Sequence, residues 1–413
     1  MTAKRGVSRW RSAYLALLTE YPQTLQQRAR LLSASPWVSG YLASHPVLLD
    51  ELLDARALQA TPQRAALAAQ LRAQLDAAAN DTERQMDILR HFKQAQTFRL
   101  VAQDVSGALP LETLADRLSE LADLILEEVI RLAWNTLRAR HRDTPRFAVI
   151  AYGKLGGKEL GYASDLDIIF LYADDHADAA ENYARLGQRI NTWLTSLTPA
   201  GTLYETDLRL RPDGAAGLLV STLEAFARYQ RESAWTWEHQ ALTRARFCAG
   251  AAAIGAAFED IRRDILQAPR DAIRLKEEVL AMRKKMRDAH PNASGLFDLK
   301  HDRGGLIDVE FTVQYLVLAH SHRHPELSAN VGNLALLERA AGLGLVPPDI
   351  ALPARDAYRE LRRRQHALRL QGADYARVPH DEAAPLAHAV TRLWQNVFAD
   401  EAPGHTTATN GPP

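Results

Sequence analysis

Residues 153–172 read GKLGGKELGYASDLDIIFLY and join a glycine-rich loop to two closely spaced aspartates and an apolar run. The run from Asp165 to Tyr172 is short and mostly apolar, which is typical of a buried strand. Phe147 to Tyr152, just upstream of the glycines, is a second run of the same kind. Together these patterns predict two core strands with a glycine-rich loop between them.

The two aspartates of this stretch form the first candidate site. Side chains on a strand alternate between faces, so Asp165 and Asp167 point the same way while Leu166 enters the core. Two neighbouring carboxylates repel each other unless cations lie between them. Mg²⁺ prefers oxygen ligands, and a pair of ions roughly 3.5–4 Å apart stabilises both the attacking and the leaving oxygen in phosphoryl-type transfer. The pair therefore indicates a metal site; two solvated acids at a strand end are the alternative.

A third strand is expected at Thr202 to Arg211, which reads TLYETDLRLR. Alternation along this strand would place Glu205, Asp207, Arg209 and Arg211 on one face. Asp207 can then complete the carboxylate cluster, and the guanidinium groups of Arg209 and Arg211 could meet triphosphate oxygens. A third acid with neighbouring arginines favours the metal site over two solvated acids.

The glycine-rich loop suggests contacts with phosphate. Gly156 and Gly157 follow the first strand at an expected helix N-terminus, where backbone N–H groups can approach phosphates without an intervening side chain. The loop resembles a P-loop only superficially. Gly153 to Lys158 is one residue short of G-x-x-x-x-G-K, and Glu159 stands where that motif requires Ser or Thr. A Walker-type ATPase is excluded on these grounds.

Helical patterns flank this region on both sides. Residues 7 to about 142 carry apolar side chains at helical spacing, and Ser35-Pro36 is a typical helix start. Leu296 to His301 is one further strand candidate, after which helical patterns continue to about Phe398. A chain of 413 residues is too long for one ordinary core. We therefore expect a predominantly helical α+β protein with two or three domains.

Charge and cysteine content restrict the class of partner. The chain has 50 Lys and Arg residues and 50 Asp and Glu residues, whereas proteins that bind a nucleic-acid backbone usually carry a basic excess. Cys248 is the sole cysteine, so neither an intramolecular disulfide nor a Cys-based zinc site is expected. No stretch approaches the roughly 20 apolar residues of a membrane helix, and the simplest expected compartment is the cytoplasm.

Two further segments carry polar groups of interest. Trp235 and Trp237 lie on an expected helix that continues to Arg244 and Arg246; we interpret the tryptophans as core residues, and the arginines as either a surface pair or phosphate contacts. Lys300 follows Phe297-Asp298-Leu299, ahead of Gly304-Gly305. A catalytic or substrate-positioning role for Lys300 and an ion pair with Asp298 or Asp308 are both open.

Five stretches of this sequence resemble the bacterial glutamine synthetase adenylyltransferase family, whose members both transfer and remove adenylyl groups. The chain contains a single Gly-Gly…Asp-x-Asp site, whereas family members carry two such domains in tandem. It looks like the C-terminal, adenylyl-transferring half, so the removing activity is not implied. The stretches are GKLGGKELGYASDLD (153–167), LYETDLRLRP (203–212), ESAWTWEHQAL (232–242), FDLK (297–300) and GGLIDVEF (304–311).

The resemblance implies a polymerase-β-like nucleotidyltransferase domain flanked by helical bundles. On that basis the expected divisions are a helical N-terminal bundle at 1–142, the nucleotidyltransferase domain at 143–305, a C-terminal helical bundle at 306–398 and a disordered tail at 399–413. The implied reaction moves AMP from ATP to a tyrosine hydroxyl of glutamine synthetase and releases pyrophosphate, in the control of nitrogen assimilation.

The resemblance also implies roles for individual residues and partners. Mg²⁺ and ATP would bind at the catalytic aspartates, with the PII regulatory protein and glutamine as candidate effectors. Two alternatives stay open: a nucleotidyltransferase with another acceptor (an RNA end, an antibiotic or PII itself), and a non-catalytic fragment that binds glutamine synthetase or PII. The expected catalytic and metal residues are Asp165, Asp167 and Asp207, and the expected nucleotide-binding residues are Gly156, Gly157, Ser164, Arg209, Arg211 and Lys300.

Overall fold

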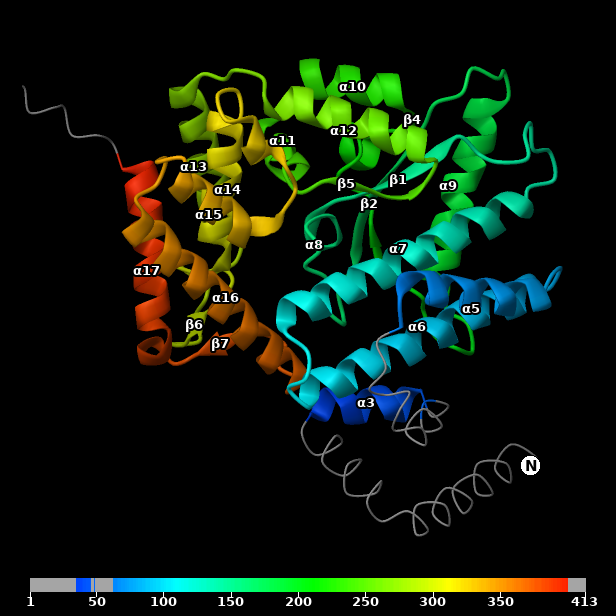
Figure 1. Cartoon of the computed structure of the whole chain (residues 1–413), viewed down its shortest axis with the longest axis horizontal. Helices are drawn as coiled ribbons and strands as arrows, with labels where there is room; N and C mark the ends of the chain where they lie inside the picture. Colours follow the sequence, from blue (N-terminus) through cyan, green and yellow to red (C-terminus); the bar gives the residue numbers. More distant parts are fainter. Residues whose placement is uncertain (1–34, 46–47, 49–61, 400–413) are drawn as a thin grey trace, which may run out of the picture. The chain divides into compact units, whose positions relative to one another are not determined.

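The computed structural model describes residues 35–45, 48 and 62–399, and these divide into two compact units (Figure 1). Unit 1 comprises the described residues up to Leu266 together with His366–Tyr375. Unit 2 comprises Gln267–Gln365 and the described residues from Ala376 onward. The expected domain divisions at 142, 305 and 398 stay predictions.

Unit 1 is built on a five-stranded mixed sheet of described residues. The strands follow the order β3-β2-β1-β5, and β4 also pairs with β2. β1 is antiparallel to both β2 and β5, whereas β3 and β4 run parallel to β2. The strands are β1 (Phe147–Ala151), β2 (Leu166–Tyr172), β3 (Thr206–Asp207), β4 (Val220–Thr222) and β5 (Arg246–Gly250).

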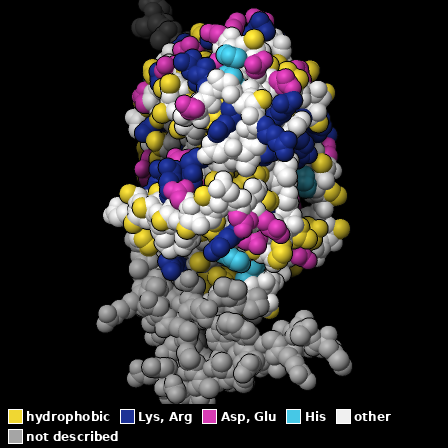
Figure 2. Space-filling model, turned by 90° about the vertical axis from the view of Figure 1, so that its right-hand side faces the viewer, with side chains coloured by type: hydrophobic (Ala, Val, Ile, Leu, Met, Phe, Trp, Pro, Cys, Tyr) yellow, Lys and Arg dark blue, Asp and Glu magenta, His cyan; other side chains and the backbone are white. Residues whose placement is uncertain are grey.

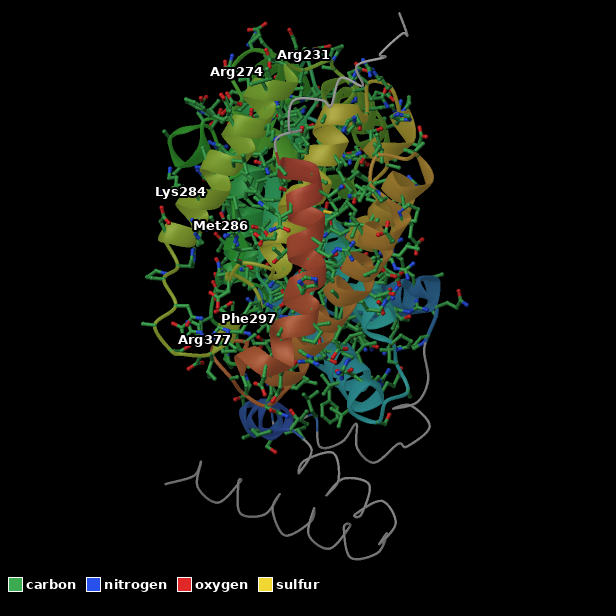
Figure 3. All side chains as sticks on the ribbon, turned by 90° about the vertical axis from the view of Figure 1, so that its left-hand side faces the viewer. Arg231, Arg274, Lys284, Met286, Phe297 and Arg377 are labelled. Atoms are coloured by element: carbon green, nitrogen blue, oxygen red, sulfur yellow. The ribbon has the colours of Figure 1, made fainter. Side chains whose placement is uncertain are left out.

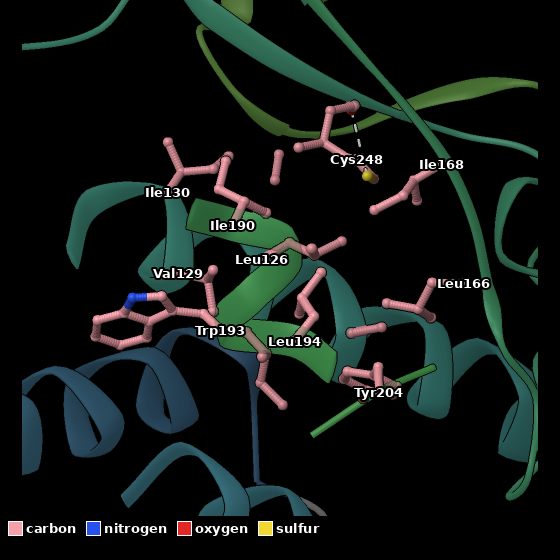
Figure 4. Close-up of a cluster of buried hydrophobic side chains, with 14 of the residues drawn as sticks. Leu126, Val129, Ile130, Leu166, Ile168, Ile190, Trp193, Leu194, Tyr204 and Cys248 are labelled. Carbon is pink, nitrogen blue, oxygen red and sulfur yellow. Dashed lines mark hydrogen bonds between the residues drawn. The ribbon is translucent and has the colours of Figure 1, made fainter. Parts of the chain in front are cut away.

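Helices cover both faces of this sheet, which explains why β1 and β2 are almost continuously apolar. α7 (Leu111–Asn135) and α9 (Ala179–Thr195) pack on one face, where Leu166 and Ile168 meet their apolar side chains (Figure 4). α10 (Leu223–Glu232) and α12 (Ala252–Leu266) cover the other face (Figure 1). The two predicted core strands are confirmed.

The other helices of unit 1 include one with an unusual buried surface. α6 (Thr82–Val105) lies beside α5 (Arg64–Ala77) and α7, and its buried side chains are largely polar. α3 (Pro36–Ser44) begins at the predicted Ser35 cap, whose side chain accepts a hydrogen bond from Val38 N. Two short helices, α8 (Gly153–Gly156) and α11 (Thr236–Leu242), and the 3₁₀ turn η3 (Gly214–Ala216) complete the unit.

Unit 2 is a helical bundle with a two-stranded sheet at its edge. α14 lies against α13, α15 and α17, so it is buried on nearly every side. β6 pairs antiparallel with β7, with Phe297 and Arg377 on the two strands (Figure 3). The elements are α13 (Ala272–Asp288), β6 (Phe297–Asp298), α14 (Leu306–His320), η4 (Pro325–Ser328), α15 (Gly332–Gly342), α16 (Pro348–Leu370), β7 (Arg377–Val378) and α17 (His380–Phe398).

The predominantly helical α+β class is confirmed, but two strand predictions were too long. The third strand, expected over 202–211, is limited to β3, because the chain curls directly after Asp207. The amide of Arg209 donates to Asp207 Oδ1 (2.9 Å), which replaces sheet pairing with a local turn. The strand expected over 296–301 is limited to β6, because Asp298 Oδ1 accepts from the amides of Lys300 and His301 (3.0 Å each).

Within the described part of the chain, no helix is long and apolar enough to cross a membrane. On the face that Figure 2 shows, acidic and basic side chains are interspersed, in keeping with the zero formal net charge.

Candidate active site

Three carboxylates meet at the start of β2. β3 runs parallel to β2 and aligns Asp207 with Asp167, so their side chains project from the same face of the sheet. Asp165 directly precedes β2. One oxygen from each of the three side chains lies within 4.8 Å of the others. The structure therefore brings together the three acids that the sequence singled out.

Gly153 gives the Asp167 carboxylate the room it occupies. Tyr152 N donates to Asp167 O (2.8 Å), which draws the start of α8 against β2. A Cβ on Gly153 would stand 2.1 Å from Asp167 Oδ2, and the residue has a φ of +52°, which glycine adopts readily. The expected site residues did not include Gly153, although its place directly after a core strand was a signal for it.

The environment of Asp167 favours a bound cation. Burial raises the pKa of Asp167 to about 6, and the neighbouring charges of Asp165 and Asp207 add to this shift. Lys154 and Arg244 act in the opposite direction but do not cancel it. Three carboxylates that share one small volume offer the all-oxygen ligand set that Mg²⁺ prefers, and a cation among them would relieve their repulsion. The residues present fit such an ion.

Arg209 and Arg211 have different surroundings. The guanidinium of Arg209 donates to both carboxylate oxygens of Asp207, and this hydrogen bonding holds the pKa of Asp207 below its usual value. Most of the Arg209 side chain (79%) remains exposed. Arg211 instead donates to the carbonyls of Leu208 (2.7 Å), three residues before it, and Gly217 (3.3 Å), six residues after it. Only Arg209 of this pair thus contacts the carboxylate cluster.

The expected helix N-terminus at Gly156 and Gly157 is wrong. α8 begins at Gly153 and ends at Gly156, which leaves Gly157 at the C-terminal cap. The amide of Gly156 donates to Tyr152 O (2.7 Å) and that of Gly157 donates to Gly153 O (3.1 Å). Both amides are already used within this single turn. Gly156 is instead required for close packing, because a Cβ there would stand 2.2 Å from Arg244 O.

Arg244 lies against the glycine-rich loop. A Cβ on Gly157 would stand 2.7 Å from Arg244 Nε, so the guanidinium packs directly on that backbone. The same guanidinium pairs with Glu159, and both side chains are largely buried. Arg246 begins β5 rather than continuing a helix, and it pairs with Asp123 (2.8 Å) in another largely buried contact. Both arginines are therefore held within unit 1.

The interpretation of the two tryptophans as core residues is wrong. Trp235 caps the N-terminus of α11 with 70% of the residue exposed, and Trp237 is 38% exposed. Glu238 of the same helix accepts hydrogen bonds from the amide of Trp235 (2.9 Å) and from Tyr229 Oη (2.9 Å). The start of α11 is thus ordered by Glu238 and not by burial of the indole rings.

The last two expected site residues lie in different units. Ser164 closes the turn before Asp165, because its Oγ accepts from Gly161 N (3.0 Å). Lys300 is exposed in unit 2. The two aspartates considered as its ion-pair partners pair with arginines: Asp298 with Arg377 (3.3 Å), and Asp308 with Arg283 (2.6 Å).

Comparison with known proteins adds two family matches. Residues 25–261 match the family described as glutamate-ammonia ligase adenylyltransferase, and residues 274–397 match the family described as GlnD PII-uridylyltransferase.

Similar full-length proteins carry one shared name. The chain is 59% identical over 388 residues to the "bifunctional glutamine synthetase adenylyltransferase/adenylyl-removing enzyme" of Aromatoleum aromaticum, covering 94% of this chain and 41% of that protein. It is 55% identical over 404 residues to the protein of that name from Nitrosomonas europaea, with 94% and 44% covered. The Chromobacterium violaceum protein of the same name is 59% identical over 389 residues, with 94% and 43% covered. The chain therefore spans less than half the length of these relatives.

Proposed function

The chain belongs to the glutamate-ammonia ligase adenylyltransferase family, and on that premise we propose that it transfers AMP from ATP to a tyrosine hydroxyl of glutamine synthetase. The observation that carries the proposal is the gathering of Asp165, Asp167 and Asp207 at the paired ends of β2 and β3. The tyrosine oxygen forms a bond to the α-phosphorus, the bond from that phosphorus to pyrophosphate breaks, and the hydroxyl proton is released.

The three carboxylates are the proposed ligands of Mg²⁺. The ion, when bound, would neutralise charge on the reacting phosphates and orient the attacking and leaving oxygens. The lowered pKa of Asp207 makes that carboxylate a weak proton acceptor, which favours a role as metal ligand over one as general base. Arg209 has an exposed guanidinium beside Asp207, so we assign to it the contact with triphosphate oxygens.

Gly157, Arg244 and Glu159 are proposed to shape the nucleotide side of the site. Their close packing fixes the loop beside Asp167, and this rigidity, rather than free loop amides, supports the position of the phosphates. Ser164 would contribute by holding the turn before Asp165. Lys300 stays a proposed nucleotide contact that rests on the family resemblance.

We also propose that unit 2 is the regulatory part of the chain. The match of residues 274–397 to a family described by the PII protein supports a response to PII, with glutamine as a second candidate effector. The interspersed charges on the face that Figure 2 shows and the zero formal net charge give no support to a nucleic-acid acceptor.

The test is transfer of label to the acceptor protein. The purified chain is incubated with Mg²⁺, α-labelled ATP and glutamine synthetase, with Asp167→Asn as the matched inactive variant. We expect label on a glutamine synthetase tyrosine with the unchanged chain and a loss of at least about 100-fold with the variant, because one ligand charge is removed. Label on PII but not on glutamine synthetase would instead identify the alternative acceptor. No transfer to either protein, although ATP binds, would support the non-catalytic alternative.

A further inference from the structure

A half-buried hydrogen-bond cluster lies behind the turn that precedes Asp165. Tyr162 Oη donates to Asp104 Oδ2 (2.9 Å), and His366 Nε2 lies 2.7 Å from the same oxygen. Asp104 is near the C-terminal end of α6, and His366 is the α16 residue at which the chain re-enters unit 1. One carboxylate oxygen thus joins three segments that are distant in the sequence.

The Tyr162 side chain is fixed by packing as well as by this hydrogen bond. Its ring stacks on Trp37 of α3, with centroids 5.0 Å apart and an angle of 26° between the planes, and lies 5.4 Å from the His366 ring. Burial raises the pKa of the Tyr162 hydroxyl, and the Asp104 charge adds to this shift, so the hydroxyl stays protonated as the donor. The ring therefore has one defined position.

A short closed turn connects this ring to Asp165. Gly161 N donates to Ser164 Oγ (3.0 Å), and Ser164 N donates to Gly161 O (3.2 Å). Sheet pairing begins after Asp165, where Leu166 N donates to Glu205 O (2.9 Å). Asp165 therefore lies between a turn held through Tyr162 and a strand held by the sheet, and a shift of the turn would move its carboxylate.

We propose that Asp104, Tyr162 and His366 are positioning residues that hold Asp165 within reach of a metal ion. The proposal rests on the metal site of the proposed function. Like-charged carboxylates repel each other, and Asp165 is the exposed member of the three, with the most freedom to move away. The cluster opposes that movement from behind the turn, as groups that orient metal ligands do elsewhere.

The first variants remove single hydrogen bonds. Tyr162→Phe keeps the stacked ring and deletes the hydroxyl. His366→Ala deletes the second contact with Asp104, and His366→Gln restores a side-chain donor. The matched control is Tyr183→Phe, because Tyr183 Oη donates to the buried carboxylate of Asp174 (2.7 Å) in the same unit. Asp174 lies beyond the other end of β2, roughly 20 Å along the strand from Asp167.

The readout is Mn²⁺ binding to the full chain, measured by electron paramagnetic resonance of the free ion, beside the urea unfolding midpoint. We expect Tyr162→Phe and His366→Ala to weaken Mn²⁺ binding about tenfold, and His366→Gln to stay within about twofold of the unchanged chain. Tyr183→Phe should lower the unfolding midpoint about as much as Tyr162→Phe and leave Mn²⁺ binding unchanged.

Two results would overturn the proposal, and they differ in meaning. If Tyr162→Phe loses stability like the control and binds Mn²⁺ like the unchanged chain, the cluster is structural only and the metal site stands. If the unchanged chain binds no more Mn²⁺ than the Asp167→Asn variant, the metal site itself is wrong, and the positioning role is lost with it.

Discussion

At the scale of single residues, Gly153 is a position near the site where the structure leaves no room for a side chain. We predict that Gly153→Ala lowers kcat/KM for adenylyl transfer about 100-fold, because the new Cβ must displace the Asp167 carboxylate, and a shift of about 1 Å in a reacting site costs that much. The control is Gly161→Ala in the same loop, where the Cβ would meet Ser164 Oγ at an ordinary 3.5 Å. Equal activity of the two variants would contradict the role of Gly153.

Asp174 offers a second prediction at this scale, one of pH-dependent stability. Its carboxylate is buried and contacts His141 Nε2 (2.9 Å), Tyr183 Oη (2.7 Å) and Arg142 Nη2 (2.7 Å). Burial raises the pKa of Asp174, but the bonds from His141 and Tyr183 and the charge of Arg142 outweigh it, so the pKa lies well below the usual value. Removing the Asp174 charge would therefore leave the side chains of His141, Tyr183 and Arg142 without the carboxylate that they contact.

We predict that Asp174→Asn lowers the free energy of unfolding by about 3 kcal/mol at neutral pH. Because the folded pKa is depressed, this contribution is complete above the unfolded value of 3.8 and declines as pH falls below it. The gap between the two proteins in urea unfolding should therefore be equal at about pH 7 and pH 5 and smaller near pH 3. Asp178→Asn, an exposed neighbour, should change stability by less than about 0.5 kcal/mol.

At the scale of elements, α6 holds the segment before β3 through hydrogen bonds from a buried polar side chain. Arg90 is fully buried and donates to the carbonyls of Gly201 (2.6 Å), Ser196 (2.6 Å) and Trp193 (3.1 Å), in the segment that leads to β3. We predict that Arg90→Met lowers the free energy of unfolding by about 3 kcal/mol, since the three carbonyls lose the hydrogen bonds from the guanidinium while the side-chain volume is nearly kept.

The measurement for Arg90 is urea unfolding monitored by far-ultraviolet circular dichroism. Arg84→Met is the matched control, because Arg84 lies in the same helix but is exposed, and we expect its effect to stay below about 0.5 kcal/mol. A loss of stability in both variants would show that substitution anywhere in α6 is destabilising, and it would contradict a specific role for the Arg90 contacts.

The elements that could be predicted from the sequence are those whose apolar residues follow directly from burial. β1 and β2 are covered on both faces, so their apolar runs were visible without any structure. The segments near the site did not follow such patterns. The alternation in TLYETDLRLR suggested one long strand, but the Asp207 carboxylate captures the Arg209 amide and ends the pairing. In the same way, the Asp298 carboxylate accepts a hydrogen bond from the Lys300 amide, and β6 ends there.

At the scale of the whole molecule, the pairings between distant segments were beyond prediction. Asp104 and His366 share a hydrogen bond across 262 positions, and periodicity carries no information about such pairs. The long helix α16 likewise reads as one pattern, yet its residues belong to unit 2 up to Gln365 and to unit 1 from His366. The three carboxylates were grouped because alternation along each expected strand placed the aspartates on one face, and the parallel pairing of β2 with β3 is what brings them together in the structure.

The division into two units leads to a prediction about which unit a bound metal ion stabilises. All three proposed ligands belong to unit 1, so Mn²⁺ should stabilise that unit by linkage, by about 1.4 kcal/mol at a concentration about ten times the dissociation constant. Hydrogen–deuterium exchange of the full chain should then slow in peptides covering β1 and β2, whose amides exchange through opening of that unit. Peptides from α14 and α17 in unit 2 should exchange at unchanged rates. Asp167→Asn should abolish the slowing in β1 and β2, and equal slowing in α14 would mean that the two units open together rather than separately.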